Sequence, residues 1–330
     1  MHYRQKDLSL LPKNKYRHQK TMRKVIGIGE TLLDIIFKDN KPVEAVPGGS
    51  TFNAIVSLGR VGADAFFVTE IGDDHVGALV RSFLSSNNVC TDYVLERKGW
   101  KSPVSLAFLD SDNNANYTFY RAPNADPVDI PLPDINPDDI VLFGSFYAVS
   151  PATRARVIAL LERARDCGAI IYYDVNFRPS HRGDVMKVTP NLIENLEFAD
   201  IVRGSRDDFE VLYKKDSAER VYRAETSFYC PRLVYTDGTR PVTVFSDGGF
   251  RKEYAMPETP TVSTIGAGDN FNAGLICAML RYDIRRADIE RGLTEAEWSK
   301  LIESATAFSA DCCAGIYNYV SKEFGASHSL

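Results

Sequence analysis

Residues 263–269 read S-T-I-G-A-G-D and run directly into N-F-N-A-G-L-I-C-A-M-L, whose small and apolar residues recur with helical spacing. The pattern predicts that Gly266, Ala267 and Gly268 open a helix. The first turn of a helix has free backbone N–H groups and a partial positive charge, and the lack of bulky side chains lets an anion approach them closely. These three residues are therefore candidate catalytic residues that would hold an anionic group of a substrate.

The carboxylate of Asp269 would lie one position inside this anion site. A carboxylate beside a phosphate is repulsive, so it needs a chemical task, and accepting the proton of a hydroxyl that attacks phosphorus is the natural one. We therefore expect Asp269 to be the catalytic base. A glycine-rich loop capped by an ordinary first-turn Asp is the alternative on these residues alone, because Gly-x-Gly is weak evidence.

Two separate motifs resemble the signatures of the PfkB (ribokinase-like) carbohydrate kinases. Residues 263–269 match the second signature, D-T-x-G-A-G-D, except that Ser263 replaces the first Asp. The segment P-G-G-S-T-F-N, which begins at residue 47, is similar to the first signature. Gly48 and Gly49 would let a sugar approach the backbone, and the amide of Asn53 can donate to and accept from sugar hydroxyls. A helix-terminal polar residue is the alternative for Asn53 taken alone.

Strand-like and helix-like segments alternate along the chain. Short apolar runs predict strands at residues 24–29, 65–70, 140–143, 169–173, 200–202, 233–235 and 242–245. Helical patterns fall at residues 51–61, 75–86, 151–167, 189–196, 206–214, 267–281 and 294–312. This alternation predicts an α/β fold with a mostly parallel central sheet, helices on both faces, and ligands bound beyond the carboxyl ends of the strands.

Residues 35–46 and 93–121 interrupt this rhythm with an alternation of period two, which is typical of extended strands. A solvated edge hairpin is the reading from the residues alone. The resemblance implies instead the small β-sheet lid of the family, which closes over the sugar and often pairs with a second subunit. We therefore expect a homodimer formed through the lid.

Two further motifs resemble sugar-binding and acceptor-binding parts of the family. The string G-E-T-L-L-D, which ends at Asp34, is similar to G-E-x-x-x-D, whose Asp binds sugar hydroxyls. A turn-forming Asp is the alternative. The string D-V-N-F-R-P resembles the D-x-N-x-R-P block of the fructokinase branch and places Arg178 near the phosphates or the acceptor. An ion pair between Arg178 and Asp174 explains the spacing equally well.

The nucleotide side is implied by three weaker matches. The string A-D-I-V-R-G-S-R-D-D is similar to A-D-x-x-x-x-N-x-x-E, with Ser205 in place of Asn and Asp208 in place of Glu. In the family that acid acts on magnesium through water. The T-D-G string of Thr236 and Gly238 resembles the T-x-G segment that meets ATP phosphates, and Thr264 of the second signature is placed with them.

The resemblance implies an ATP-dependent sugar kinase with Mg²⁺ that phosphorylates a primary hydroxyl. Fructose is favoured because R-A-P-N-A-D, which begins at Arg121, looks like the fructokinase lid pattern. The alternative is 2-keto-3-deoxygluconate, whose carboxylate would suit Arg121 equally well, and ribose or nucleosides rank below both. Potassium activation is doubtful, because Ser263 removes a carboxylate from the family's cation site. A non-catalytic sugar or nucleotide sensor competes from another class, whereas an NAD dehydrogenase is opposed by the missing third glycine in G-I-G-E-T.

Composition limits the classes of partner. Apolar residues make up 44% and charged residues 25% of the 330 residues, and no apolar run approaches the roughly 18 residues that a membrane span needs. The first 24 residues carry a net charge of +7, so the remainder carries −12, which argues against nucleic-acid binding. The six cysteines show no metal spacing. Because the sequence shows no secretion signal, we expect the reducing cytoplasm as the compartment.

The first residues also suggest where the folded part starts. We expect residues 1–22 to be a disordered basic leader, with Met22 as the working start, although an arm that contacts RNA is the alternative. We expect residues 23–330 to form one kinase domain with an inserted lid.

Overall fold

The computed structural model describes residues 23–109, 115–120 and 130–330. Within them, a ten-stranded sheet has the order β14-β13-β12-β11-β10-β9-β1-β4-β5, with β6 also paired to β4. All of its pairings are parallel except those of β13 with β12 and β14. The strands are β1 (Lys24–Ile28), β4 (Asp64–Gly72), β5 (Val89–Cys90), β6 (Val94–Arg97), β9 (Ile140–Gly144), β10 (Ile170–Asp174), β11 (Ile201–Ser205), β12 (Leu233–Thr236), β13 (Val242–Ser246) and β14 (Phe250–Tyr254).

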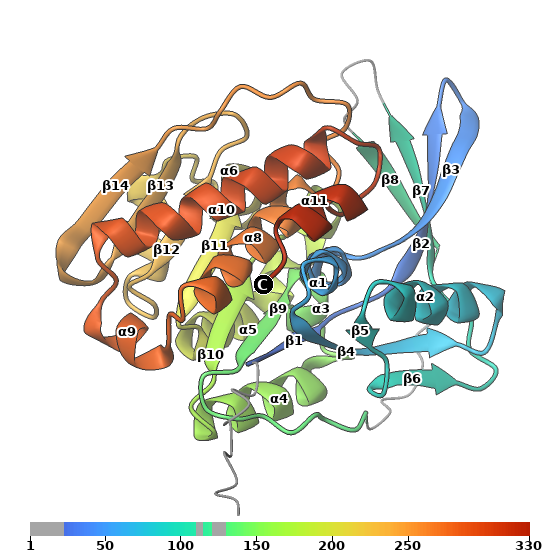
Figure 1. The fold of residues 1–330 in the computed structure, drawn as a ribbon, viewed down its shortest axis with the longest axis horizontal. Coiled ribbons are helices and arrows are strands. Elements are labelled where there is room, and N and C mark those ends of the chain that lie inside the picture. The colour runs from blue at the N-terminus through green and yellow to red at the C-terminus, as the bar shows by residue number, and fades with distance from the viewer. Residues whose placement is uncertain (1–22, 110–114, 121–129) are drawn as a thin grey trace, which may run out of the picture.

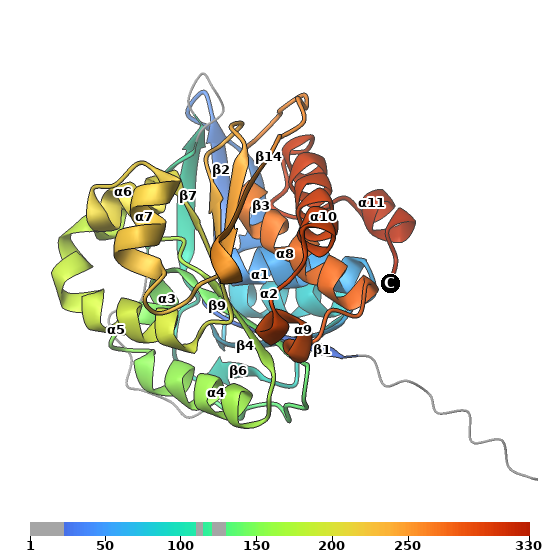
Figure 2. The same cartoon turned by 90° about the vertical axis from the view of Figure 1, so that its left-hand side faces the viewer.

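Helices cover both faces of this sheet, as the edge-on view in Figure 2 shows. One layer holds α1 (Ser50–Arg60), α2 (His75–Ser86), α8 (Ala267–Arg281), α9 (Arg286–Arg291), α10 (Glu295–Cys313) and α11 (Lys322–Ser327). The other holds α3 (Ser145–Val149), α4 (Arg154–Asp166), α5 (Val185–Phe198), α6 (Arg206–Tyr213) and α7 (Ala218–Val221). Short 3₁₀ or π turns are η1 (Pro179–Asp184), η2 (Tyr222–Thr226) and η3 (Asp247–Gly249).

The central strands are buried on both sides, which explains their continuous apolar sequence. In β10, Ile170 and Tyr172 face one hydrophobic core, whereas Ile171 and Tyr173 face the other. Strands that bury both faces cannot alternate polar with apolar residues. The predicted α/β class with a mostly parallel sheet between two helical layers is confirmed.

A second, four-stranded sheet stands beside the main one, with the order β3-β2-β7-β8 (Figure 1). We call it the lid sheet; its strands are β2 (Leu32–Lys38), β3 (Lys41–Gly48), β7 (Val104–Leu109) and β8 (Ala115–Tyr120). The two spans expected for a lid, residues 35–46 and 93–121, supply most of it. Strand β6 lies inside the second span, but it pairs with β4 of the main sheet instead.

Two sequence expectations differ from the structure in detail. The helix expected at residues 151–167 begins only at Arg154, and a separate short helix, α3, precedes it. Pro151 explains the break, because a proline disfavours helical geometry at the residue before it, and Ser150 is extended (φ −65°, ψ 131°). Strand β14 was not expected, because its sequence F-R-K-E-Y carries the charges of a solvated edge strand.

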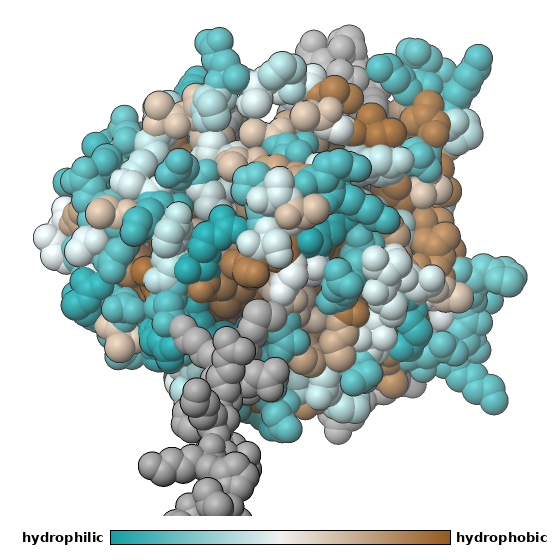
Figure 3. Space-filling view, in the orientation of Figure 1, coloured by the Kyte–Doolittle hydropathy of each residue, from teal (hydrophilic) through white to brown (hydrophobic). Residues whose placement is uncertain are grey.

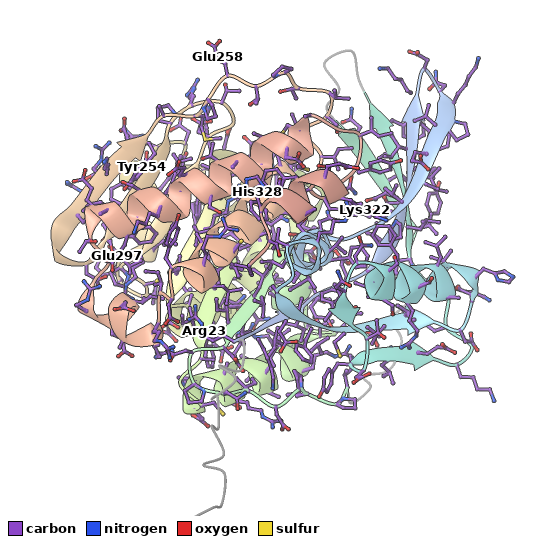
Figure 4. The ribbon with its side chains drawn as sticks, viewed as in Figure 1. Arg23, Tyr254, Glu258, Glu297, Lys322 and His328 are labelled. Carbon is purple, nitrogen blue, oxygen red and sulfur yellow. The ribbon has the colours of Figure 1, made fainter. Side chains whose placement is uncertain are left out.

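Hydrogen bonds join the residue before β1 to α8, the helix that follows the glycine turn. Arg23, labelled in Figure 4, donates from its guanidinium to the main-chain oxygens of Met279 and Ile284, each at 2.7 Å. Met279 lies in the last turn of α8, and Ile284 follows that helix. Residues 1–22, expected as a leader, and Arg121, expected as a lid residue, lie outside the described residues. None of the described helices is long and apolar enough to cross a bilayer.

Candidate active site

The polar side chains predicted for the site gather where parallel strands end. Strands β10, β11 and β12 end at Asp174, Ser205 and Thr236, and the amino ends of α1 and α8 meet them there. Ligands of α/β proteins bind at this edge of the sheet, because helix amino ends and loops converge on it. The described fold therefore brings together residues that lie more than two hundred positions apart.

The glycine turn before α8 has a conformation that requires glycine. Gly266 has φ +77° as the residue before the helix, and a Cβ there would lie 2.5 Å from the main-chain oxygen of Asn318. A Cβ on Gly268 would lie 2.9 Å from Nη1 of Arg203, so any larger residue would displace that guanidinium. At the start of this fifteen-residue helix the Ala267 N–H donates to the Thr264 main-chain oxygen, so the turn leaves the N–H groups of Gly268 and Asp269 without a main-chain acceptor in the described structure and keeps a buried cation beneath them.

Asp269 lies in the first turn of α8 and is held by two side chains of α1. Its Oδ1 accepts a hydrogen bond from Ser50 Oγ at 2.8 Å, and its Oδ2 accepts one from Asn53 Nδ2 at 2.8 Å. Burial raises the pKa of the Asp269 carboxyl, while the bonds from Asn53 and Ser50 and the nearby cation of Arg178 oppose that rise. The result is a fixed carboxylate that is more basic than an exposed one.

On the lid side of the site, Asp34 of strand β2 supplies a second buried carboxylate. Its carboxylate accepts hydrogen bonds from Ser105 Oγ of the neighbouring strand β7 and from Asn318 Nδ2, the latter at 3.0 Å. Burial raises the pKa of Asp34 to about 6, although these two donors and Arg178 oppose it. The adjoining Gly49 has φ +132°, and a Cβ there would lie 2.3 Å from the Glu30 main-chain oxygen.

Arg203 is a buried cation beneath the glycine turn. Its Nη1 pairs with Asp174 Oδ1 at 3.0 Å, and its Nη2 donates to Thr236 Oγ1 at 2.7 Å. Burial opposes its charge, but Asp174 and Asp208 together raise its pKa. A permanently charged guanidinium therefore lies under the helix amino end, where it adds to the attraction for an anion.

Asp208 serves first as a structural cap. Its Oδ1 accepts from the Phe177 main-chain N–H at 2.8 Å, and its Oδ2 accepts from the N–H and the Oγ of Ser205, each at 2.7 Å. Ser205 in turn accepts from the Asp208 N–H, which completes a capping box at the start of α6. Both oxygens are engaged, so a cation would meet Asp208 through a water more readily than directly.

Two cavities meet at Asp269. We name them after the expectations from the sequence: the sugar-side cavity is lined by the lid and α1, and the phosphate-side cavity lies in front of β11, α6 and the glycine turn. The residues that line both are Asn176, Arg178, Ile265, Gly266 and Asp269. A hydroxyl in one cavity and a phosphate in the other would therefore approach each other beside the Asp269 carboxylate.

Most predicted site residues line one of these cavities. Asp34, Gly49 and Asn53 line the sugar-side cavity, and Ser205, Asp208, Thr264 and Gly268 line the phosphate-side cavity. Four others do not line either: Gly48, Thr236, Gly238 and Ala267. Thr236 still reaches the site through its bond to Arg203, whereas Gly238 lies in the exposed turn after β12.

Several residues of the site were not predicted from the sequence, among them Ser50, Arg203 and Asn318. Ser50 directly follows the two glycines, where a helix-starting hydroxyl was a usable signal. Arg203 interrupts the apolar strand I-V-R-G-S, and a charge in a buried strand indicates a paired functional group. Asn318 lies in a bend after α10, and its sequence context gave no signal.

The described part of the chain holds no group of three or more His, Cys, Asp or Glu side chains that could bind a metal ion. Ser263, where the resemblance implied a cation site, is buried, and its Oγ accepts from the Ile265 N–H at 3.2 Å. A hydroxyl used in this way offers a cation less than a carboxylate would.

Comparison with known proteins gives the same picture of the fold. A family model described as pfkB family carbohydrate kinase matches residues 22–313. The chain is 24% identical over 285 residues to a probable chloroplastic fructokinase-6 of Arabidopsis thaliana, covering 82% of this chain and 74% of the relative. It is 22% identical over 264 residues to a fructokinase of Vibrio alginolyticus, covering 79% and 85%.

Solved structures match over nearly the whole chain. Fructokinase from Vibrio cholerae O395, bound to fructose, ADP and calcium, has a TM-score of 0.80 at 19% identity and covers 94% of this chain and 99% of its own. Aminoimidazole riboside kinase from Salmonella enterica, bound to aminoimidazole riboside and an ATP analog, has a TM-score of 0.79 at 21% identity and covers 92% and 99%. At these identities the structural likeness establishes the fold alone.

Proposed function

Because the chain belongs to the pfkB family of carbohydrate kinases, we propose that it transfers the γ-phosphoryl group of ATP to a primary hydroxyl of fructose. One observation carries the proposal: Asp269 lies where the sugar-side and phosphate-side cavities meet. Phosphoryl transfer needs an acceptor hydroxyl, a proton acceptor and an anion site in line, and this junction supplies the last two. The curated relatives named above are fructokinases, which supports the choice of sugar.

The proposed proton acceptor is the Asp269 carboxylate. Burial raises its pKa, which brings its basicity closer to what a general base needs at neutral pH. Ser50 and Asn53 fix the orientation of the carboxylate through 2.8 Å hydrogen bonds, so no reorganisation is needed before the proton moves. The attacking oxygen then forms its bond to the γ-phosphorus as ADP leaves.

Negative charge on the transferred group would be balanced by groups that line or underlie the phosphate-side cavity. The N–H groups of Gly268 and Asp269 lie at the positive end of α8, and the Arg203 guanidinium lies directly beneath Gly268. Arg178 lines both cavities and can contact a phosphate that passes between them. This arrangement stabilises the developing charge without moving the backbone.

Magnesium is proposed as the metal that accompanies ATP. Asp208 would meet it through water, because its two oxygens already accept three hydrogen bonds from protein donors. The adjacent Asp207 is exposed and lines the same cavity, so it offers a second carboxylate. The bound metal would neutralise phosphate charge.

The lining of the sugar-side cavity favours a neutral polyol over a sugar acid. Its carboxylates are Glu30, Asp34 and Asp269, and the buried amide oxygens of Asn53 and Asn318 have no hydrogen-bond partner in the described structure. These five groups accept hydrogen bonds, and a sugar with several hydroxyls supplies the donors. Arg178 also lines this cavity, so a carboxylate on the ligand would meet like charge from three groups and opposite charge from one arginine. The argument for 2-keto-3-deoxygluconate depends on Arg121, outside the described residues.

A homodimer through the lid is proposed from the chemistry of its outer face. Side chains alternate in β2, with Leu32, Asp34 and Ile36 buried and with Leu33, Ile35 and Phe37 half-buried. The neighbouring Leu106 and Phe108 of β7 continue the half-buried face. Brown side chains gather over the lid sheet in Figure 3. A second copy would cover this apolar face, which is otherwise costly to expose.

The cytoplasm is proposed as the compartment. All six cysteines are free thiols, and three of them, Cys230, Cys277 and Cys312, are buried. Reduced cysteines persist in a reducing compartment.

The proposal is tested by measuring ATP consumption with the purified protein and a panel of fructose, 2-keto-3-deoxygluconate, ribose, aminoimidazole riboside and glucose. We expect fructose to give the highest kcat/KM. A higher value for 2-keto-3-deoxygluconate would replace fructose with that substrate. No ATP consumption with any sugar, together with sugar binding, would favour a sensor on the same fold.

A further inference from the structure

The segment after α10 enters the sugar-side cavity through one buried side chain. Asn318 is 1% exposed and lines that cavity, whereas the neighbouring Tyr317 is 46% exposed. The following helix, α11, starts at Lys322, labelled in Figure 4, and packs on α1. The segment is therefore fixed at both ends while Asn318 faces the cavity.

Asn318 is held on three sides by atoms of the site. Its Nδ2 donates to Asp34 Oδ2 at 3.0 Å. Its main-chain oxygen accepts from Asn270 Nδ2 at 2.8 Å, and it lies 2.5 Å from where a Cβ of Gly266 would be. The same residue thus contacts the lid-side carboxylate and the turn that opens α8.

The remaining atom of the amide is unpaired. Asn318 Oδ1 is buried, accepts no hydrogen bond in the described structure, and belongs to a side chain that lines the cavity. A buried acceptor without a donor is unfavourable, so native proteins keep one chiefly where a ligand or water completes it. A hydroxyl of the bound sugar is a donor of the right kind.

We propose that Asn318 is a sugar-binding residue that selects for a hydroxyl donor on the substrate. The inference rests on the proposed function, because it assumes that the cavity holds the sugar. Asn318 Nδ2 fixes the amide by its bond to Asp34, so Oδ1 can only accept. A sugar that lacks the matching hydroxyl leaves Oδ1 unpaired and binds less well, and a substrate that carries an acceptor there is rejected.

The test is a set of kinetic cycles between Asn318 variants and substrate analogues. kcat and KM are measured for fructose and for each of its monodeoxy analogues with the wild-type enzyme and with Asn318→Ala. For one analogue we expect the wild-type kcat/KM to fall about 10-fold, the usual effect of one lost hydrogen bond. Asn318→Ala should be weakened on fructose and show almost no further loss on that analogue.

Two further variants separate binding from a merely structural effect. Tyr319→Phe removes the bond from the Tyr319 hydroxyl to the Pro47 main-chain oxygen (3.4 Å) in the same segment, and Tyr319 does not line the cavity. It should discriminate against the analogue as the wild type does. If Asn318→Ala does not fold, Asn318→Leu serves instead, because it keeps the size and shape of the amide without an acceptor and should lose the discrimination as Asn318→Ala does.

The outcomes separate this inference from the proposed function. Active wild-type enzyme with no analogue that couples to Asn318→Ala, or an Asn318→Leu enzyme that discriminates as the wild type does, would overturn the role of Asn318 alone. If the wild type phosphorylates another sugar, the analogues are made from that sugar. A wild type that phosphorylates no sugar would overturn the proposed function and this inference with it.

Discussion

Replacing Asp269 by Asn is the sharpest perturbation of the proposed chemistry, because it removes the proton acceptor and keeps the shape. In the structure the two carboxylate oxygens accept from Ser50 Oγ and Asn53 Nδ2, each at 2.8 Å. An amide can keep the Asn53 bond with its oxygen. Its NH₂ can then donate to the Ser50 hydroxyl, which accepts as well as donates. The fold around the site should therefore survive.

The expected loss is large and confined to turnover. General-base catalysis contributes about 10²–10⁴-fold, which is about 3–5 kcal/mol of transition-state stabilisation. The phosphate-side contacts come from main-chain N–H groups and arginines, which Asp269→Asn leaves in place. We therefore expect kcat to fall by that factor while the Kd for ATP changes less than about threefold.

The assay is steady-state kinetics with fructose together with calorimetric titration of ATP. Ser50→Ala is the matched control, since it removes one bond to the carboxylate and leaves the base, and it should cost no more than about tenfold. An Asp269→Asn enzyme within a few fold of the wild-type kcat would remove Asp269 from the mechanism. A loss confined to ATP binding would show that the residue acts on the nucleotide instead.

The other predictions concern the leader, pH, cations and substrate choice. Deleting residues 1–21 should leave the melting temperature and kinase activity unchanged. A deletion that also removes Arg23 should lower the melting temperature, because the hydrogen bonds to the main-chain oxygens of Met279 and Ile284 are lost. Equal effects of the two deletions on the melting temperature would refute this. Burial raises the pKa of Asp34 to about 6. The hydrogen bonds from Ser105 and Asn318 and the charge of Arg178 lower this pKa, whereas the charge of Asp269 raises it further, and the net rise favours the protonated form in the folded state. The stability that wild type holds over Asp34→Asn is therefore greatest near pH 4 and should fall by about 3 kcal/mol as pH rises through 6, as urea unfolding would show; a rise instead would reverse the assignment. Replacing potassium by sodium should change kcat less than about twofold, since Ser263 offers a hydroxyl already bonded to Ile265, and a larger potassium effect would show a cation site. The ratio of kcat/KM for fructose to that for 2-keto-3-deoxygluconate should exceed one in the wild type, and Arg121→Gln should lower kcat/KM for fructose only modestly. A ratio below one, together with loss of activity on the acid when Arg121 is changed, would promote the acid.

The sequence allowed the fold to be predicted because its strands are buried on both faces. Such strands read as short apolar runs between helical patterns, and the runs at residues 140–143 and 169–173 became β9 and β10. Strand β14 was not predicted, because the charged residues of an edge strand give a sequence pattern like that of a loop. The lid boundary was harder still, since β6 has the same local pattern as lid strands and only its long-range partner, β4, distinguishes it.

The site was partly predictable for a related reason. Motif residues such as Asn53 and Asp269 closely follow glycine turns, whose backbone demands leave a local signature. Asn318 has no such signature, because its role comes from distant partners, Asp34 and Gly266, that only the folded chain brings near. Contacts of that kind are not encoded in any short stretch of sequence.

The most direct test of the central claim is a phosphorus NMR spectrum of the products formed from ATP and fructose by the wild-type enzyme and by Asp269→Asn. The account predicts one new phosphate monoester on a primary hydroxyl of the sugar, formed in equal amount to ADP by the wild type and about 10²–10⁴-fold more slowly by the variant. Release of inorganic phosphate without a sugar ester, or an ester formed at the same rate by both proteins, would contradict it.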